Sequence, residues 1–197
     1  MEKLRNHSGL DSVRVFRPCD VHATTECWKM AMNNMQTPTA LIFSRQNVKD
    51  LPAKAGSDRF TDSLQAQKGA YVVNEVNGKP DIVLLANGSE VSTMAEGMAK
   101  LEADGIKVQL VSACSEGRFR DQDKAYQESV IPSDIPVLGL TAGIPVALEG
   151  LAGKNGKVIG LDHFGYSAPY QVLDEKFGFT GENVYNQAKA WLKEWNK

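Results

Sequence analysis

The sequence lacks the features that mark membrane-spanning, secreted and nucleic-acid-binding proteins. Its longest apolar runs, such as residues 82–86, are far too short to cross a bilayer. The first seven residues contain no apolar stretch of the signal-peptide kind, so we expect no such peptide. The net charge is −2, which predicts no broad basic surface for nucleic acid. We therefore expect a cytoplasmic protein that binds neither membrane nor nucleic acid.

Cysteine and histidine are also scarce, with three of each. Cys19, Cys27 and Cys114 show no CxxC spacing, which argues against a disulfide framework or a zinc site. The histidines match no metal motif, and His163 is expected to be a solvent-facing or hydrogen-bonded loop residue. No P-loop, Gly-x-Ser-x-Gly or Gly-x-Gly-x-x-Gly motif is present, and no carboxylate spacing indicates an acid–base pair. The residues alone therefore name no reaction.

What the sequence does contain is an alternation of strand-like and helical segments. With 42% hydrophobic and 23% charged residues, the chain can bury a globular core. The pattern predicts an α/β fold, a three-layer open sheet of about five mostly parallel strands with helices on both faces. The predicted strands cover residues 13–16, 39–43, 70–76, 81–86, 107–112, 137–141 and 158–161. The predicted helices cover 21–36, 90–104, 121–130, 145–151, 169–177 and 182–195.

The clearest unit is a βαβ crossover in the middle of the chain. Residues 82–86 and 108–111 are predicted to be parallel neighbours, because right-handed crossovers join parallel strands. Ser89 is expected to cap the intervening helix, and Gly105 to end it. The turn at 87–90 contains one glycine and a carboxylate, so it is a helix start rather than a phosphate cradle.

The most informative segment is Ser44-Arg45-Gln46-Asn47. It follows residues 39–43, which are predicted to form a strand buried on both faces. Ligands bind at the carboxyl ends of strands in open α/β sheets, and an arginine there suits a phosphate. Pairing of Arg45 with a local carboxylate is the alternative.

Three stretches together resemble the C-terminal part of transketolases. They are residues 16–20 with 38–47 (Pro-Thr-Ala-Leu-Ile-Phe-Ser-Arg-Gln-Asn), residues 69–73 with 86–91 (Ala-Asn-Gly-Ser-Glu-Val), and residues 164–169 with 177–180. They occur in the family's order over nearly the whole chain. The Ser-Arg-Gln-Asn segment distinguishes transketolases from deoxyxylulose phosphate synthases and pyruvate dehydrogenase beta subunits.

This resemblance implies a domain organisation and an activity. Residues 1–50 would be the tail of a pyrimidine-binding domain, 51–68 a surface linker with one helical turn, and 69–197 the C-terminal domain. The complete enzyme would transfer a two-carbon ketol unit between phosphorylated sugars of the pentose phosphate pathway. It would be a homodimer that uses thiamine diphosphate and a divalent metal, magnesium or calcium. Its pyrophosphate domain and most of its pyrimidine domain are not represented here.

Of the family's site residues, only Arg45 carries over, as the ligand of the substrate phosphate. The metal-binding Gly-Asp-Gly motif, the glutamate that activates the cofactor and the Gly-Pro-Thr-His segment are absent. We therefore expect no catalytic, cofactor-binding or metal-binding residue in this chain, and no activity of the chain alone. At Gly139–Gly143 the chain has Leu-Thr-Ala where many members carry a Val-Glu-Ala-like run, so no role of that glutamate is transferred.

Two interpretations stay open. The chain is a fragment or subunit of an enzyme, or it is a free-standing α/β module for packing or for binding a small anion. The reading frame upstream of Met1 would distinguish them. Under either interpretation, the first fifty residues should be less stable than the rest, because most of their sheet is missing.

Overall fold

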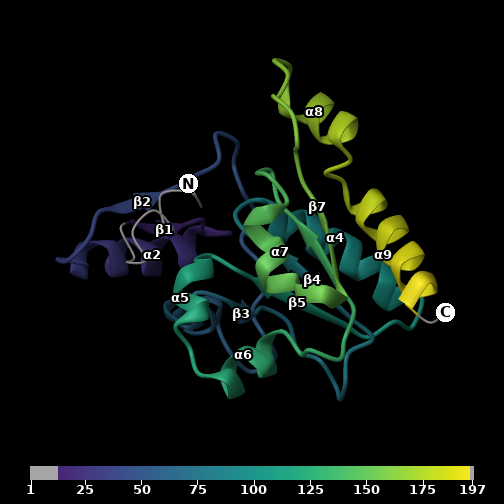
Figure 1. Cartoon of the computed structure of the whole chain (residues 1–197), viewed down its shortest axis with the longest axis horizontal. Coiled ribbons are helices and arrows are strands. Elements are labelled where there is room, and N and C mark those ends of the chain that lie inside the picture. Colours follow the sequence, from purple (N-terminus) through teal and green to yellow (C-terminus); the bar gives the residue numbers. More distant parts are fainter. Residues whose placement is uncertain (1–12, 196–197) are drawn as a thin grey trace.

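The computed structural model describes residues 13–195, which form two sheets (Figure 1). A two-stranded parallel sheet precedes a five-stranded sheet of order β3-β5-β4-β6-β7, in which only β3 is antiparallel to its neighbour. The strands are β1 (Arg14–Phe16), β2 (Thr39–Leu41), β3 (Tyr71–Val72), β4 (Ile82–Ala86), β5 (Val108–Ser112), β6 (Val137–Leu140) and β7 (Gly156–Ile159). The helices are α2 (Val21–Asn33), α3 (Arg59–Ser63), α4 (Glu90–Ala103), α5 (Glu116–Arg120), α6 (Lys124–Val130), α7 (Val146–Ala152), α8 (Tyr170–Phe177) and α9 (Gly181–Trp195), with 3₁₀ turns η1 (Leu64–Lys68) and η2 (Gly153–Asn155).

The predicted α/β class, with its mostly parallel sheet, is confirmed. β4 and β5 are parallel neighbours, as predicted, and α4 forms the crossover between them; Ile82 lies opposite Val108. Gly105 follows the C-cap of α4 with φ +79°, the left-handed conformation that a glycine allows. The sequence did not predict α5, which is only five residues long.

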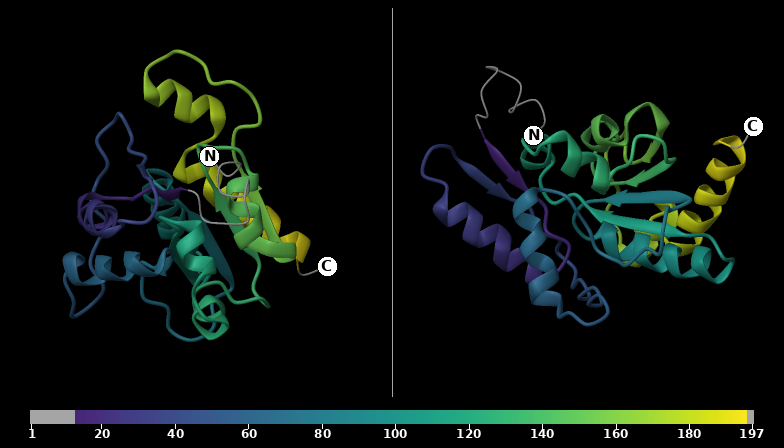
Figure 2. Two further views of the ribbon diagram at one scale, coloured as in Figure 1. Left: turned by 60° about the vertical axis from the view of Figure 1, so that its left-hand side comes forward. Right: turned by 90° about the horizontal axis from the view of Figure 1, so that it is seen from below.

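Helices cover both faces of the large sheet, because successive side chains of a strand point to opposite sides. On β4, Ile82 and Leu84 belong to the core that α4 and α9 cover. Val83 and Leu85 belong to a second core that α5, α6 and α7 cover. The small sheet and α2 lie beside one end of the large sheet (Figure 2). Backbone bonds join them there, with Arg17 N–H donating to the Cys114 carbonyl.

The prediction of a strand buried on both faces at residues 39–43 is wrong. β2 ends at Leu41, its three residues are only partly buried, and Phe43 is 50% exposed. The physical reason is that β2 has a single neighbour, β1, and α2 covers one face of the pair. An apolar strand therefore lies at the edge of an incomplete sheet.

Several large apolar side chains of α2 face outward. Asp20 caps α2, accepting a bond from the Ala23 amide at 2.8 Å. The residues that α2 buries are Ala23, Glu26 and Cys27, whereas Met32 is 71% exposed. Trp28 stacks on Phe43, two residues beyond β2, with ring centroids 6.4 Å apart. α2 therefore carries an uncovered apolar surface within the described residues.

The strand expected over residues 70–76 is much shorter, since β3 contains only Tyr71 and Val72. The side chain of Asn74 takes over the pairing with β5. Its amide donates to the Val108 carbonyl at 2.8 Å, and its oxygen accepts from the Leu110 amide at 2.8 Å. This side chain replaces backbone ladder bonds and ends the strand.

Residues 51–68 contain more structure than a surface linker with one turn. They form α3 and η1, and the side chain of Arg59 is only 7% exposed. Arg59 donates from Nε to the carboxylate of Asp20 at 2.6 Å and from Nη2 to the hydroxyl of Tyr71 at 2.8 Å. Burial raises the pKa of the neighbouring Cys19 thiol to about 11, with the Asp20 charge acting in the same direction. The segment thus joins α2 to β3 through a buried ion pair.

Candidate functional site

The candidate site lies where the two sheets meet, at the carboxyl ends of β4 and β6. After β4 the chain enters α4 on one face of the sheet, and after β6 it enters α7 on the other face. Such a divergence opens a crevice where open α/β proteins commonly bind ligands. Asn87 and Glu90, which follow β4, and Thr141, which follows β6, are buried polar residues at this end of the sheet.

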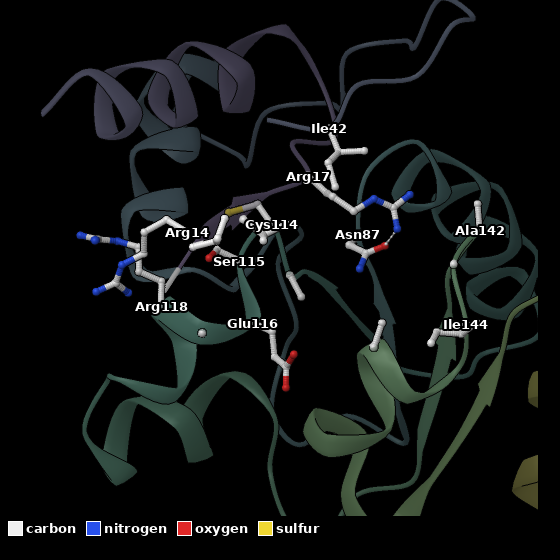
Figure 3. Close-up of a pocket in the computed structure, with 16 residues that line it drawn as sticks. Arg14, Arg17, Ile42, Asn87, Cys114, Ser115, Glu116, Arg118, Ala142 and Ile144 are labelled. Atoms are coloured by element: carbon white, nitrogen blue, oxygen red, sulfur yellow. Dashed lines mark hydrogen bonds between the residues drawn. The ribbon is translucent and has the colours of Figure 1, made fainter. Parts of the chain in front are cut away.

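Arg17, which follows β1, inserts its guanidinium between these three residues. Nη1 donates to Asn87 Oδ1 at 2.6 Å and to Thr141 Oγ1 at 3.0 Å, and Nη2 pairs with Glu90 at 3.1 Å. Figure 3 shows the bond from Arg17 to Asn87. The turn after β4 therefore binds the guanidinium of Arg17 from the same chain. Because Arg17 follows β1, these bonds also attach the small sheet to the large one. Thr141 also donates from its hydroxyl to Asn87 Oδ1 at 3.1 Å, so it takes part in this network.

The sequence did not single out Arg17, although it follows a strand just as Arg45 does. The expected cap of α4 also differs. Ser89 makes no side-chain capping bond, and its hydroxyl donates to Glu90 at 2.8 Å. This bond holds the carboxylate that pairs with Arg17.

A cavity of about 420 Å³ adjoins Arg17 on the side of β5 (Figure 3). Its wall combines apolar side chains, such as Ile42 and Ile144, with polar ones, such as Ser115 and Glu116. The carboxylate of Glu116 also pairs with Arg120 at 2.6 Å. The size of the cavity is within the range of small-molecule sites.

A second cavity of about 310 Å³ lies on the other side of Arg17. Ser44 and Gln46, which flank Arg45, line it together with Tyr170 and Asp174 of α8. Burial raises the pKa of the Asp174 carboxyl, and the charge of Glu90 adds to this effect. The segment containing Arg45 thus faces a hollow of mixed polar and apolar lining between the small sheet and α8.

Arg45 itself is exposed, four residues beyond the end of β2. No carboxylate within residues 13–195 forms an ion pair with it. The alternative of a local carboxylate partner therefore has no support in this structure. An unpaired guanidinium at a strand's carboxyl end is available to an anion.

The remaining candidates supply no reactive group. His163 is an exposed loop residue whose Nδ1 lies 2.7 Å from the Phe164 carbonyl oxygen, as expected for a hydrogen-bonded loop histidine. Within the described range, no group of three or more histidine, cysteine or acidic side chains could hold a metal ion. No helix between residues 13 and 195 has the length and apolar character needed to cross a membrane.

Comparisons with known proteins identify the family. Residues 69–180 match the model of the transketolase-like TK C-terminal domain. Transketolase 1 of Vibrio parahaemolyticus is 41% identical over 182 residues, which are 92% of this chain and 27% of that protein. The solved transketolase of Leishmania mexicana superposes with a TM-score of 0.84 at 30% identity, covering all of this chain and 27% of that one.

A split-gene transketolase, solved as an inactive β4 tetramer, shares the fold with a TM-score of 0.71 at 20% identity. It is matched over 93% of this chain and 59% of its own. The chain spans about a quarter of the length of the curated relatives that it matches. Since the matched model covers more than half of its residues, this chain belongs to the family of transketolase-like C-terminal domains.

Proposed function

We propose that this chain works as the C-terminal part of a transketolase, which transfers a two-carbon ketol unit between phosphorylated sugars of the pentose phosphate pathway. The observation that carries the proposal is the identity of 41% to a transketolase across 92% of the chain. The exposed, unpaired Arg45 after β2 adds chemical support, because the substrates of such an enzyme carry phosphate.

In this proposal Arg45 binds the terminal phosphate of the sugar. Its planar group can donate two parallel bonds to phosphate oxygens. The Arg17 network holds β1 in place, and Ile42 N–H donates to the Phe16 carbonyl at 2.9 Å, so β2 and the following segment are held as well. Arg17 is then a positioning residue, and Arg45 is the residue that touches substrate.

The proposal divides the chain into the tail of a pyrimidine-binding domain (1–50), a linker (51–68) and the C-terminal domain (69–197). The family match beginning at residue 69 supports the last boundary. The open edge of β2 and the exposed apolar side chains of α2 support the first, because the rest of a pyrimidine domain would cover them. The split-gene transketolase is a precedent for such an enzyme with a divided gene.

Thiamine diphosphate and its divalent metal, magnesium or calcium, would be held by other parts of the enzyme. The described residues do not fit that role, since they offer no metal-ligand cluster. In the assembled enzyme the cofactor would supply an electron sink for the reaction, and this chain would supply phosphate binding. We further propose a homodimeric assembly in the cytoplasm.

A chimera tests the proposal. The chain replaces the matching quarter of the Vibrio parahaemolyticus transketolase, and the unaltered Vibrio enzyme is the positive control. We expect ketol transfer by the chimera and none by the 197-residue chain alone. Gel filtration and a melting curve establish that the chimera is folded. A folded chimera without activity would contradict the proposal and favour a free-standing packing or anion-binding module.

A further inference from the structure

A third cavity, of about 330 Å³, lies between α2 and α5, and Arg14 and Arg118 line both this cavity and the one in Figure 3. Its wall is mainly polar. The lining side chains include the cations Arg14, Lys29 and Arg118, the amides Asn33 and Gln67, and one carboxylate, Glu26. None of the residues that line the hollow beside Arg45 lines this cavity. The two places are therefore separate.

Positive charge exceeds negative charge in this wall. Glu26 is almost fully buried, accepts a bond from the Gln67 amide at 2.9 Å and lies 3.7 Å from Lys29. Arg14 pairs with Asp121, which lies outside the cavity wall, at 3.0 Å. One carboxylate in the wall thus faces three cations, and no carboxylate within residues 13–195 pairs with Arg118.

Arg118 is the best-placed of these cations. Its Nε donates to the Gln67 carbonyl at 2.7 Å, which fixes the plane of the guanidinium. No carboxylate within residues 13–195 pairs with it. Its two Nη groups therefore remain as donors in a preset orientation. Figure 3 shows the side chains of Arg118 and Arg14 next to each other, and both residues also line the cavity drawn there.

Gathering like charges around a polar hollow is unfavourable unless an anion offsets them. A fixed guanidinium beside a lysine and the Asn33 amide is a donor set that suits a tetrahedral dianion. We infer that the cavity between α2 and α5 binds a small phosphate-bearing anion, either free phosphate or a phosphate monoester. The site would lie at the joint between α2 and the large sheet, so occupancy would also stabilise that joint.

The test is a nuclear magnetic resonance titration of the full ¹⁵N-labelled chain at constant ionic strength. The probes are inorganic phosphate and glycerol phosphate, with glycerol and sodium chloride as neutral and ionic controls. We expect saturable shifts of the amides in residues 26–34 and 116–120 with both phosphates. Tighter binding of glycerol phosphate would identify a monoester as the ligand, and equal binding would identify free phosphate.

Variants decide whether the signal comes from this cavity. Arg118→Gln should weaken binding tenfold or more, because it removes charge-assisted bonds. Lys29→Gln should also weaken it, and the Lys29 side chain is 58% exposed. The matched control is Arg120→Gln, which removes the same charge from α5 outside the cavity and should leave the affinity unchanged. Arg45→Gln should leave these shifts unchanged, which separates the result from the proposed role of Arg45.

Shifts that never saturate, or that the chloride control reproduces, would overturn the inference. Equal losses of affinity for Arg118→Gln and Arg120→Gln would also overturn it, because general charge attraction would then explain the binding. A melting curve for each variant shows that the fold is intact.

Discussion

The buried ion pair between Arg59 and Asp20 should hold the small sheet and α2 against the rest of the molecule. The two side chains are 7% and 0% exposed, and Nε lies 2.6 Å from the carboxylate. Arg59→Met keeps most of the side-chain volume and removes the charge. It leaves the Asp20 carboxylate buried without its cation, and breaking such a pair costs about 3–5 kcal/mol.

The cost should lie near the lower end of that range, about 3 kcal/mol. Asp20 keeps bonds from the Ala23 amide at 2.8 Å and the Leu51 amide at 3.4 Å, which still stabilise its charge. In addition, Nη1 of Arg59 has no partner, so the substitution also removes a buried unsatisfied group. For a domain of ordinary stability, 3 kcal/mol is a large fraction of the total.

Urea unfolding of the 197-residue chain measures this effect. Arg45→Met is the control, because Arg45 is exposed and unpaired, and it should change the free energy of unfolding by less than 0.5 kcal/mol or so. The double variant with Asp20→Asn and Arg59→Met should lose less than the sum of the two single losses. A loss below about 1 kcal/mol for Arg59→Met would refute the reasoning, since a buried charge would then be tolerated without its partner.

Three further outcomes are expected. Gly97→Ala should destabilise the chain by about 1–3 kcal/mol in urea unfolding, because the added Cβ would lie 2.4 Å from Val184 Cγ1 where α4 meets α9. The same substitution should cost less in a Val184→Ala background, and an equal cost would contradict the packing argument. The free energy of unfolding should fall between pH 9 and about 11, because the unfolded Cys19 thiol ionises near its ordinary pKa of 9.0 while the folded thiol keeps its proton to about 11. In the Cys19→Ala variant this fall should be shallower by up to about 1.4 kcal/mol per pH unit. The same slope in both proteins would contradict the role of Cys19. Calorimetry should detect no binding of thiamine diphosphate with magnesium to the isolated chain, and micromolar affinity would contradict that expectation.

Sequence patterns predicted the parts of this fold whose stability is local. The strand of residues 82–86 is buried because helices cover both faces of the large sheet, and its apolar run predicted this correctly. A similar apolar run at residues 39–43 gave a wrong prediction of burial, because burial depends on neighbouring elements that the described residues do not contain. A strand's own residues do not say whether its sheet is complete.

Long-range polar contacts were the least predictable feature. Arg17 meets Asn87 and Thr141 across 70 and 124 positions of sequence, and no local pattern predicts which strand ends will face each other. Arg59 lies in a segment of mixed polar composition that predicted a linker, yet it is buried. Arg45 was found only because its tetrapeptide follows a strand and resembles a family motif.

Steady-state kinetics of the Arg45→Ala chimera test the central claim most directly. With a phosphorylated acceptor, KM should rise about ten- to a hundred-fold, because a charge-assisted bond contributes roughly 1.5–3 kcal/mol, and kcat should change less. A non-phosphorylated acceptor should be almost unaffected, and Arg45→Lys should restore binding only in part. An equal loss of kcat/KM for both acceptors, with a lower melting temperature, would show that Arg45 only supports the turn after β2 and would contradict its role in binding phosphate.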